Sequence, residues 1–168
     1  MRDKRIKPTL EKNETSTPTI IESTWDQERN LFFTHISGRI SFNDVKNWEE
    51  GMYQESSKIP PNTEFTFLVD ERQYEFENMD VHKCKRDVIP IFLARYGLIL
   101  SALPEDEKKD LEKNTVLDRH NIRCIAMAMV HHDVDKMREL NKDFGNDQQK
   151  YLSDINTANQ FLNKFKSS

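Results

Sequence analysis

Three side chains able to bind anions or exchange protons lie close together in the middle of the chain. Asp70 and Arg72 follow an apolar run, and His82 comes one short loop later. Such a carboxylate, guanidinium and imidazole can serve an enzyme as base, anion clamp and proton carrier. The same groups can instead pair with one another and with Arg39, and no nucleophile motif names a reaction. We therefore expect no catalytic activity, and we keep an enzyme that uses Asp70 and His82 as an alternative.

A second group of potential ligands, His131, His132 and Asp133, follows another apolar run. Imidazole and carboxylate groups bind transition metals. Neighbouring residues of a strand point to opposite faces, however, so the two imidazoles do not readily meet one ion, and no further spaced ligand set is visible. The chain has 4 glycines, and none of them forms a phosphate-binding loop. We expect neither a metal nor a cofactor.

The apolar run before Asp70 predicts the central strand. Residues 65–69 read FTFLV, which is apolar on both faces, as in a strand covered on each side. A polar and aromatic loop follows, and then Asn78 and Asp80 can cap a helix whose apolar positions recur at helical spacing. Pro90 inside that helix predicts a kink or a break. Since ligands of open α/β sheets bind beyond the carboxyl ends of strands, we expect the functional surface in the loop after Asp70.

The remaining apolar patterns predict the rest of the sheet and its covering helices. Gly38 predicts a bulge or a close backbone approach near the end of the second strand. Residues 101–119 are strongly charged, which is typical of a solvated insertion with a short surface helix. The alternation of elements predicts an α/β domain with a mixed sheet of about four to five strands, in the order ββαβαβαβα, covered by helices. Strands are expected at 19–25, 31–40, 122–130 and 149–152, and helices at 42–58, 134–144 and 155–165.

The composition is that of an ordinary globular domain. Its 168 residues suffice for a single core, which we assign to residues 18–168, after a tail at 1–17 that is too poor in apolar groups to pack. With 32% charged residues and a net charge of −4, the chain has no general attraction to nucleic acid. No apolar run approaches the ~18 residues that cross a bilayer, so no integral membrane segment is expected. Cys84 and Cys124 have no closely spaced partner and are expected to be reduced core thiols, which favours a cytoplasmic location.

Five stretches, taken in order, resemble a known superfamily. ISGRISFNDVKNW is similar to a strand that ends in Gly-Arg-Leu and leads into a helix, and FLVDERQYEF to a central strand followed by Asp-x-x-x-aromatic. CIAMAMV, DVDKMRELNKDF and KYLSDINTANQFL are similar to a later strand, a helix with a central Met, and a closing Asp-x-x-x-Ala-x-x-aromatic-Leu pattern. Over residues 19–165 the chain thus resembles the STAS-like domains related to sporulation anti-sigma-factor antagonists, in particular their broad bacterial branch.

The resemblance implies a noncatalytic domain that binds a partner protein or a small ligand. Characterised members of the superfamily are switched by phosphorylation of a serine in the loop after the central strand. This chain has no Ser or Thr between Thr66 and Ser101, so that switch has no acceptor hydroxyl here. Asp80, near a helix N-terminus where an anion is stabilised, can imitate a permanent charge or act as an ordinary helix cap.

We therefore expect a regulatory binding domain that engages a protein partner or a small ligand through the loop after the central strand and the following helix. The residues expected to make that contact are Asp70, Arg72, Tyr74, Asp80, His82 and Arg39. An alternative is a carrier of a small apolar ligand or lipid in a crevice between the sheet and the helices. Residues that could line this crevice, although such types also fill ordinary cores, are Met127, Met129, Phe92 and Ile99. Neither hypothesis fixes the oligomeric state.

Overall fold

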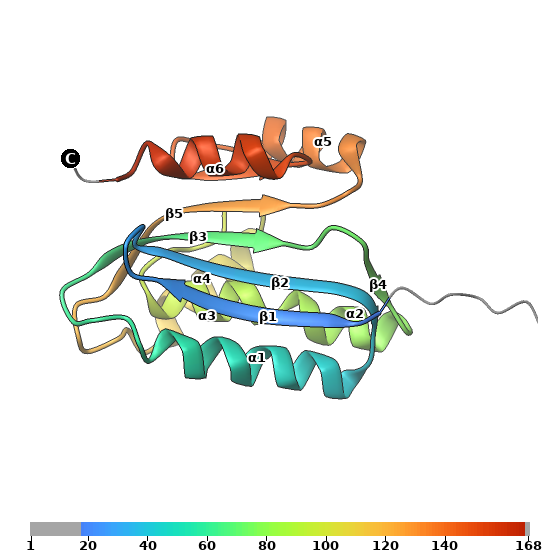
Figure 1. Cartoon of the computed structure of the whole chain (residues 1–168), viewed down its shortest axis with the longest axis horizontal. Helices are drawn as coiled ribbons and strands as arrows, with labels where there is room; N and C mark the ends of the chain where they lie inside the picture. The colour runs from blue at the N-terminus through green and yellow to red at the C-terminus, as the bar shows by residue number, and fades with distance from the viewer. Residues whose placement is uncertain (1–17, 167–168) are drawn as a thin grey trace, which may run out of the picture.

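The computed structural model describes residues 18–166 and begins with an antiparallel hairpin (Figure 1). Strand β1 (Ile20–Asp26) pairs with β2 (Leu31–Ile40), and Asn30 ends the connecting turn with a positive φ of 46°. Both strands lie within one residue of the positions predicted from their alternating apolar pattern. The expected tail at 1–17 lies outside the described residues.

Parallel strands extend the sheet from β2, in the order β1-β2-β3-β5-β6. The added strands are β3 (Glu64–Asp70), β5 (Arg123–Val130) and β6 (Gln149–Leu152), and all three were predicted. The α/β class with a mixed sheet is therefore confirmed. Because β2, β3, β5 and β6 cross the sheet in chain order, the strand order does not reverse anywhere within residues 18–166. The crevice that such a reversal opens in other α/β sheets is therefore missing from this part of the chain.

A sixth strand, β4 (Tyr74–Phe76), lies where the sequence predicted only a loop, and the loop prediction is wrong at these residues. Strand β2 is longer than its neighbour and pairs with β3 only through 31–35. The last residues of β2 therefore offer unpaired backbone groups, and β4 takes them in parallel register, with Gly38 opposite Tyr74. This pairing turns the chain after β3 back toward β2.

Helices cover both faces of the sheet (Figure 1). Helix α6 packs on β3 and β5 on one face, α1 to α3 pack on the other, and α5 packs along β6. Within the described residues, no helix combines the length and apolar character required to cross a membrane. The helices are α1 (Phe42–Ser56), α2 (Met79–Arg86), α3 (Val88–Arg95), α4 (Glu105–Asn114), α5 (Val134–Phe144) and α6 (Ile155–Asn163).

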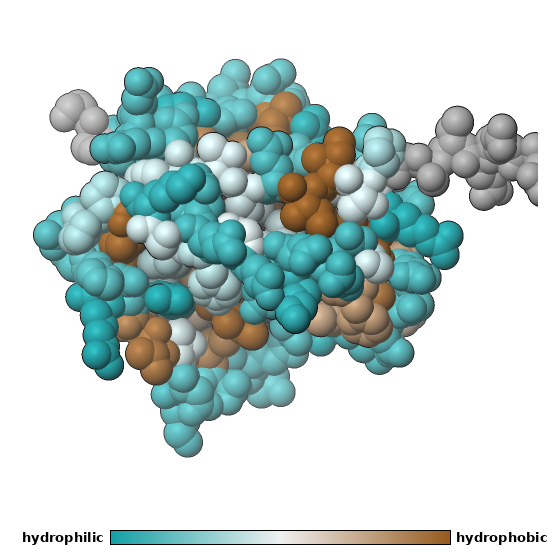
Figure 2. All heavy atoms as spheres, turned by 60° about the horizontal axis from the view of Figure 1, so that its bottom comes forward, coloured by the Kyte–Doolittle hydropathy of each residue, from teal (hydrophilic) through white to brown (hydrophobic). Residues whose placement is uncertain are grey.

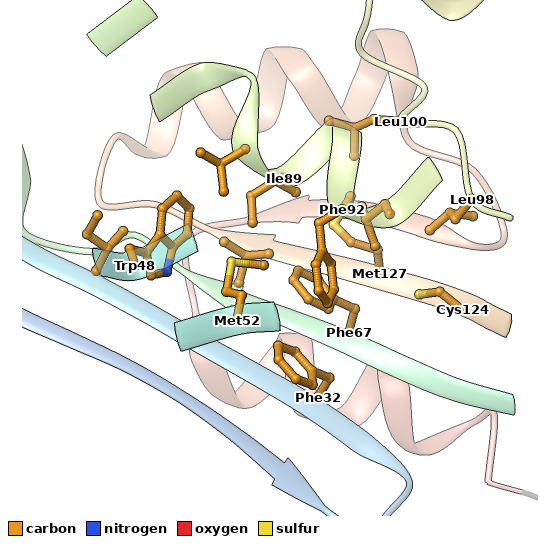
Figure 3. Close-up of a cluster of buried hydrophobic side chains, with 14 of the residues drawn as sticks. Phe32, Trp48, Met52, Phe67, Ile89, Phe92, Leu98, Leu100, Cys124 and Met127 are labelled. Carbon is orange, nitrogen blue, oxygen red and sulfur yellow. The ribbon is translucent and has the colours of Figure 1, made fainter. Parts of the chain in front are cut away.

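The larger core lies between the sheet and α1 to α3 and combines aliphatic, aromatic and sulfur-containing side chains (Figure 3). The rings of Phe32 and Phe67 stack with centroids 5.5 Å apart, and the ring of Phe92 lies 5.5 Å from that of Phe67. Burial of each such ring contributes about 1.5–3 kcal/mol. Phe92 and Met127 are fully buried in this cluster, so of the two interpretations open for them, core filling and lining a crevice, the structure supports core filling.

The helix predicted after the central strand is broken into α2 and α3, as Pro90 indicated. Asp87 ends α2 and precedes α3, so Pro90 falls in the first turn of α3, where a missing N–H costs little. Asn78 caps α2 by accepting a hydrogen bond from the backbone N–H of Val81. Asp80 is an exposed residue of the first turn, so its interpretation as the cap is wrong.

Two further predictions about single residues have opposite outcomes. Gly38 has a φ of +82°, and a Cβ there would lie 2.6 Å from the carbonyl oxygen of Pro18, which confirms the close backbone approach. Cys124 is buried, as expected of a core thiol, but Cys84 is exposed on α2, because it lies on the face of the helix turned away from the sheet.

The charged segment 101–119 is more than a solvated insertion. Helix α4 within it has no buried residue, as the sequence predicted. The residues just before α4 behave differently, because Ala102 and Leu103 pack against the larger core cluster. These two side chains form part of the wall of a cavity.

Candidate functional site

A pocket with a cavity volume of about 340 Å³ lies between α2 and α3 on one side and α5 on the other. The segment 100–107 and the ends of β5 and β6 complete its wall. Cavities of this size bind small organic molecules in other proteins. We call this cavity the α2–α5 pocket.

One end of the α2–α5 pocket is apolar. Ile89 comes from α3, Leu100 and Leu103 from the segment before α4, Met129 from β5 and Leu140 from α5. In Figure 3, Ile89 and Leu100 lie on the side of the core away from Phe32. Met129 is the one residue of the predicted crevice that reaches this pocket. Burying an apolar ligand surface here is favourable by roughly 25 cal/mol per Å².

Hydrogen bonds to β6 hold the wall segment in place. The side chain of Gln149 accepts a hydrogen bond from the backbone N–H of Ser101 at 2.7 Å and donates one to the carbonyl of Ile99 at 2.9 Å. The hydroxyl of Tyr151 lies 3.1 Å from Ser101 Oγ and accepts a hydrogen bond from the N–H of Ala102 at 3.3 Å. The apolar wall is thus supported by the sheet, although no regular element contains it.

The other end of the pocket holds a buried ion pair between Glu71 and Lys85. Glu71 directly follows β3, and Lys85 comes from the last turn of α2. The ammonium of Lys85 also lies 4.6 Å from the centroid of the Tyr74 ring, within the range of a cation–π contact. The burial of Lys85 could not be predicted from the sequence, because the residue lies in a run of basic residues that is typical of a solvated helix face.

Tyr74 and His82 also line this end of the pocket. Each has a buried polar atom that lacks a hydrogen-bond partner among the described residues, the hydroxyl of Tyr74 and Nδ1 of His82. Burial raises the pKa of Tyr74, and the charge of Glu71 raises it further, so the phenol stays protonated. Burial lowers the pKa of His82, and the nearby charge of Lys85 lowers it again, so the imidazole is neutral at pH 7. An unpaired buried polar group costs about 1–3 kcal/mol, which a ligand that pairs with it can recover.

His131 also lines the pocket, beside its neighbour His132. The prediction that their side chains point to opposite faces is wrong, because both residues follow the end of β5 and their rings stack with centroids 4.2 Å apart. Nδ1 of His131 accepts the N–H of Asp133 at 3.0 Å, and Nδ1 of His132 accepts the N–H of Gln73 at 3.2 Å. No group of three or more His, Cys, Asp or Glu side chains in residues 18–166 is arranged to hold a metal.

Asp70 lies on the opposite face of the sheet. Arg72 donates to its carboxylate through Nε at 2.9 Å and through a terminal nitrogen at 2.8 Å. Burial alone would raise the pKa of Asp70, but these hydrogen bonds outweigh it and lower the pKa. His35 Nδ1 lies 3.2 Å from the same carboxylate, and His35 Nε2 lies 3.1 Å from Ser37 Oγ. This Ser–His–Asp succession resembles a relay, but Ser37 is only 3% exposed and no substrate carbonyl can reach its hydroxyl.

The structure therefore divides the residues predicted to form one site. Tyr74 and His82 lie at the α2–α5 pocket, whereas Asp70 and Arg72 pair with each other on the other face. The base and proton carrier of the alternative enzyme are thus not brought together. Arg39 is exposed and makes no ion pair with Asp70.

Comparison with known proteins adds no further information on this site. No family model matches the chain, and no curated protein or solved structure gives a significant match. The chemistry of the α2–α5 pocket is therefore inferred from its own side chains.

Proposed function

We propose that this chain is a noncatalytic domain that binds a small, mainly apolar ligand in the α2–α5 pocket. One observation carries the proposal: a cavity of about 340 Å³ has an apolar end and, at the other end, the unpartnered polar atoms of Tyr74 and His82. Apolar walls with a few placed polar groups are the usual composition of small-molecule sites. The ligand supplies the partners that these two atoms lack among the described residues.

A regulatory role is supported by the resemblance to the STAS-like domains, whose characterised members bind and do not catalyse. In this chain the segment between Thr66 and Ser101 has no Ser or Thr, so the serine switch of those domains has no acceptor hydroxyl there. Occupancy of the pocket is then the signal in place of phosphorylation. The free thiols of Cys84 and Cys124 favour a reducing compartment, such as the cytoplasm, as the setting.

A second candidate function, contact with a protein partner, is favoured by the exposed apolar side chains of Phe76 and Met79. Both lie in the segment between the central strand and α2, and Phe76 packs against His82 with ring centroids 4.5 Å apart. Figure 2 shows apolar groups gathered in a few patches on a face that is otherwise largely hydrophilic. Replacing Phe76 and Met79 by Ser should abolish capture of a partner while leaving the fold intact, and unchanged capture would remove this surface from consideration.

Native mass spectrometry of the protein purified from its own host tests ligand binding directly. The wild-type chain should carry the added mass of a small molecule, and Ala102→Phe, which fills the wall of the pocket, should lose it. Val116→Phe is the matched control, because Val116 is exposed and lies outside this pocket. An added mass that survives in Ala102→Phe would place the ligand elsewhere, and its absence from the wild-type chain would count against the proposal.

A further inference from the structure

We propose that the α2–α5 pocket selects a ligand with a carboxylate head group on a short apolar chain; this inference rests on the proposed binding function. The head group lies at the end formed by Tyr74, His82 and Lys136, and the chain lies against the apolar wall. The distribution of charge and the hydrogen-bonding types at the polar end carry the inference.

The charge of the pocket wall has the opposite sign to that of the whole chain. The wall carries the cationic Lys85, Arg86 and Lys136 against the anionic Glu71 and Glu107, whereas the chain has a net charge of −4. Lys85 is already paired with the carboxylate of Glu71. Arg86 has only a long contact, 3.8 Å, with Asp87, and Lys136 makes no ion pair with any residue of 18–166. Lys136 is therefore the cation most available to a ligand.

The two polar groups without a hydrogen-bond partner, the Tyr74 hydroxyl and Nδ1 of His82, can both donate a hydrogen bond. The Tyr74 hydroxyl is protonated, and a neutral His82 in the Nδ1–H tautomer presents a second donor. A carboxylate is acceptor-only, with two oxygens, so it can accept both hydrogen bonds while its charge faces Lys136. An ammonium group has no acceptor for either donor, and an alcohol oxygen carries no charge for the lysine.

Burial and nearby positive charges lower the pKa of both histidines of the pocket wall, His82 and His131. Beyond the effect of burial, Lys85, Lys136 and Arg86 all lower the pKa of His82, and Glu71 opposes them. Beyond burial and the neighbouring His132, Lys136 and Lys85 lower the pKa of His131, which Glu71 also opposes. A field that disfavours an added proton favours an added anion.

Titration calorimetry with three probes of equal chain length tests the head group: octanoate, octan-1-ol and octylamine, each below its micelle concentration. Octanoate should bind the wild-type chain about tenfold more tightly than either of the others. Lys136→Gln should weaken octanoate binding about two- to fivefold and leave octan-1-ol unchanged, because the lysine is exposed to solvent. Lys142→Gln, an exposed position on the same helix outside the pocket, should change neither affinity.

Tyr74→Phe removes the buried hydroxyl and keeps the ring, and it should weaken octanoate binding about fivefold or more, with Tyr53→Phe as control. Equal affinity for the three probes, abolished for all of them by Ala102→Phe, would overturn the carboxylate preference and leave the proposed function standing. Tighter binding of octylamine would overturn it in favour of a cationic ligand. Binding of none of the three probes would contradict both the carboxylate preference and the apolar pocket.

Discussion

The carboxylate of Glu71 and the ammonium of Lys85 form an ion pair that joins the end of β3 to the last turn of α2 at the wall of the pocket. Their side chains are only 6% and 9% exposed. A buried pair of this kind is costly to form, but removal of one partner leaves an uncompensated charge in the interior. The pair therefore fixes where α2 lies relative to the sheet, and with it the position of His82.

Lys85→Met should lower the free energy of unfolding by about 3–5 kcal/mol, because Glu71 is then buried without a counter-charge. The double variant Glu71→Gln/Lys85→Met should recover most of that loss. Urea denaturation of Lys85→Met, Glu71→Gln and the double variant measures the coupling free energy between the two side chains. Lys83→Met, on the exposed face of α2, is the control. Additive effects of the two single substitutions would mean that the pair does not couple β3 to α2.

Asp70→Asn should destabilise the domain by about 1–3 kcal/mol, because Asp70 is buried and accepts two side-chain hydrogen bonds from Arg72. Asp80→Asn, at an exposed position, should change the free energy of unfolding by less than about 0.5 kcal/mol. Thermal and urea unfolding of both variants provide the comparison. Equal stability of the two variants would show that the Asp70–Arg72 contact has no structural role.

The sequence predicts those elements whose apolar pattern is strong enough to indicate burial by itself. Residues 65–69 and 122–130 are nearly continuous apolar runs, and they became the interior strands β3 and β5. The break in the helix could be predicted as well, because it depends only on the presence of Pro90 in the local sequence. Strand β4 was missed because its three residues become a strand only by pairing with the free end of β2.

Gly38→Ala should destabilise the domain by at least about 1–2 kcal/mol, since its φ of +82° is unfavourable for a residue with a Cβ and that atom would lie 2.6 Å from the carbonyl oxygen of Pro18. Gly51→Ala is the matched control within α1. A Cβ at Gly51 has no atom within 4 Å, so this substitution should stabilise the domain by about 0.5–1 kcal/mol. Urea denaturation that gave the same sign for both changes would contradict this account of Gly38.

Stability should decline in mild acid through His82. The pKa of His82 is lower in the folded chain than its ordinary value of 6.5, which applies to the unfolded chain. At pH values between the two pKa values the unfolded chain therefore binds more protons than the folded chain. The free energy of unfolding should therefore fall as the pH drops from about 7.5 to about 5.5, and His82→Gln should reduce the slope. His120→Gln, at an exposed position outside the pocket, should leave the slope as in the wild-type chain. A slope that is unchanged in His82→Gln would contradict the burial of a neutral imidazole there.

The pocket itself could not be predicted, because its wall joins side chains from Glu71 to Tyr151 that no local pattern connects. Lys85 looks like a surface lysine in the sequence, and only its contact with Glu71 reveals that it is buried. The sequence predicted that Tyr74, in the loop after the central strand, and His82, in the first turn of the following helix, share one surface with Asp70. The alternation of side chains at the end of β3 separates them, since it sends Asp70 to one face and Glu71 to the other.

Chemical-shift mapping of the ¹⁵N-labelled chain during titration with octanoate shows directly which residues surround the bound ligand. The largest amide shifts should cluster in α2, in the segment 100–104 and in α5, and Ala102→Phe should remove them. Shifts concentrated around His35 and Asp70 on the opposite face of the sheet, or no saturable shift in the wild-type chain, would contradict a ligand site in the α2–α5 pocket.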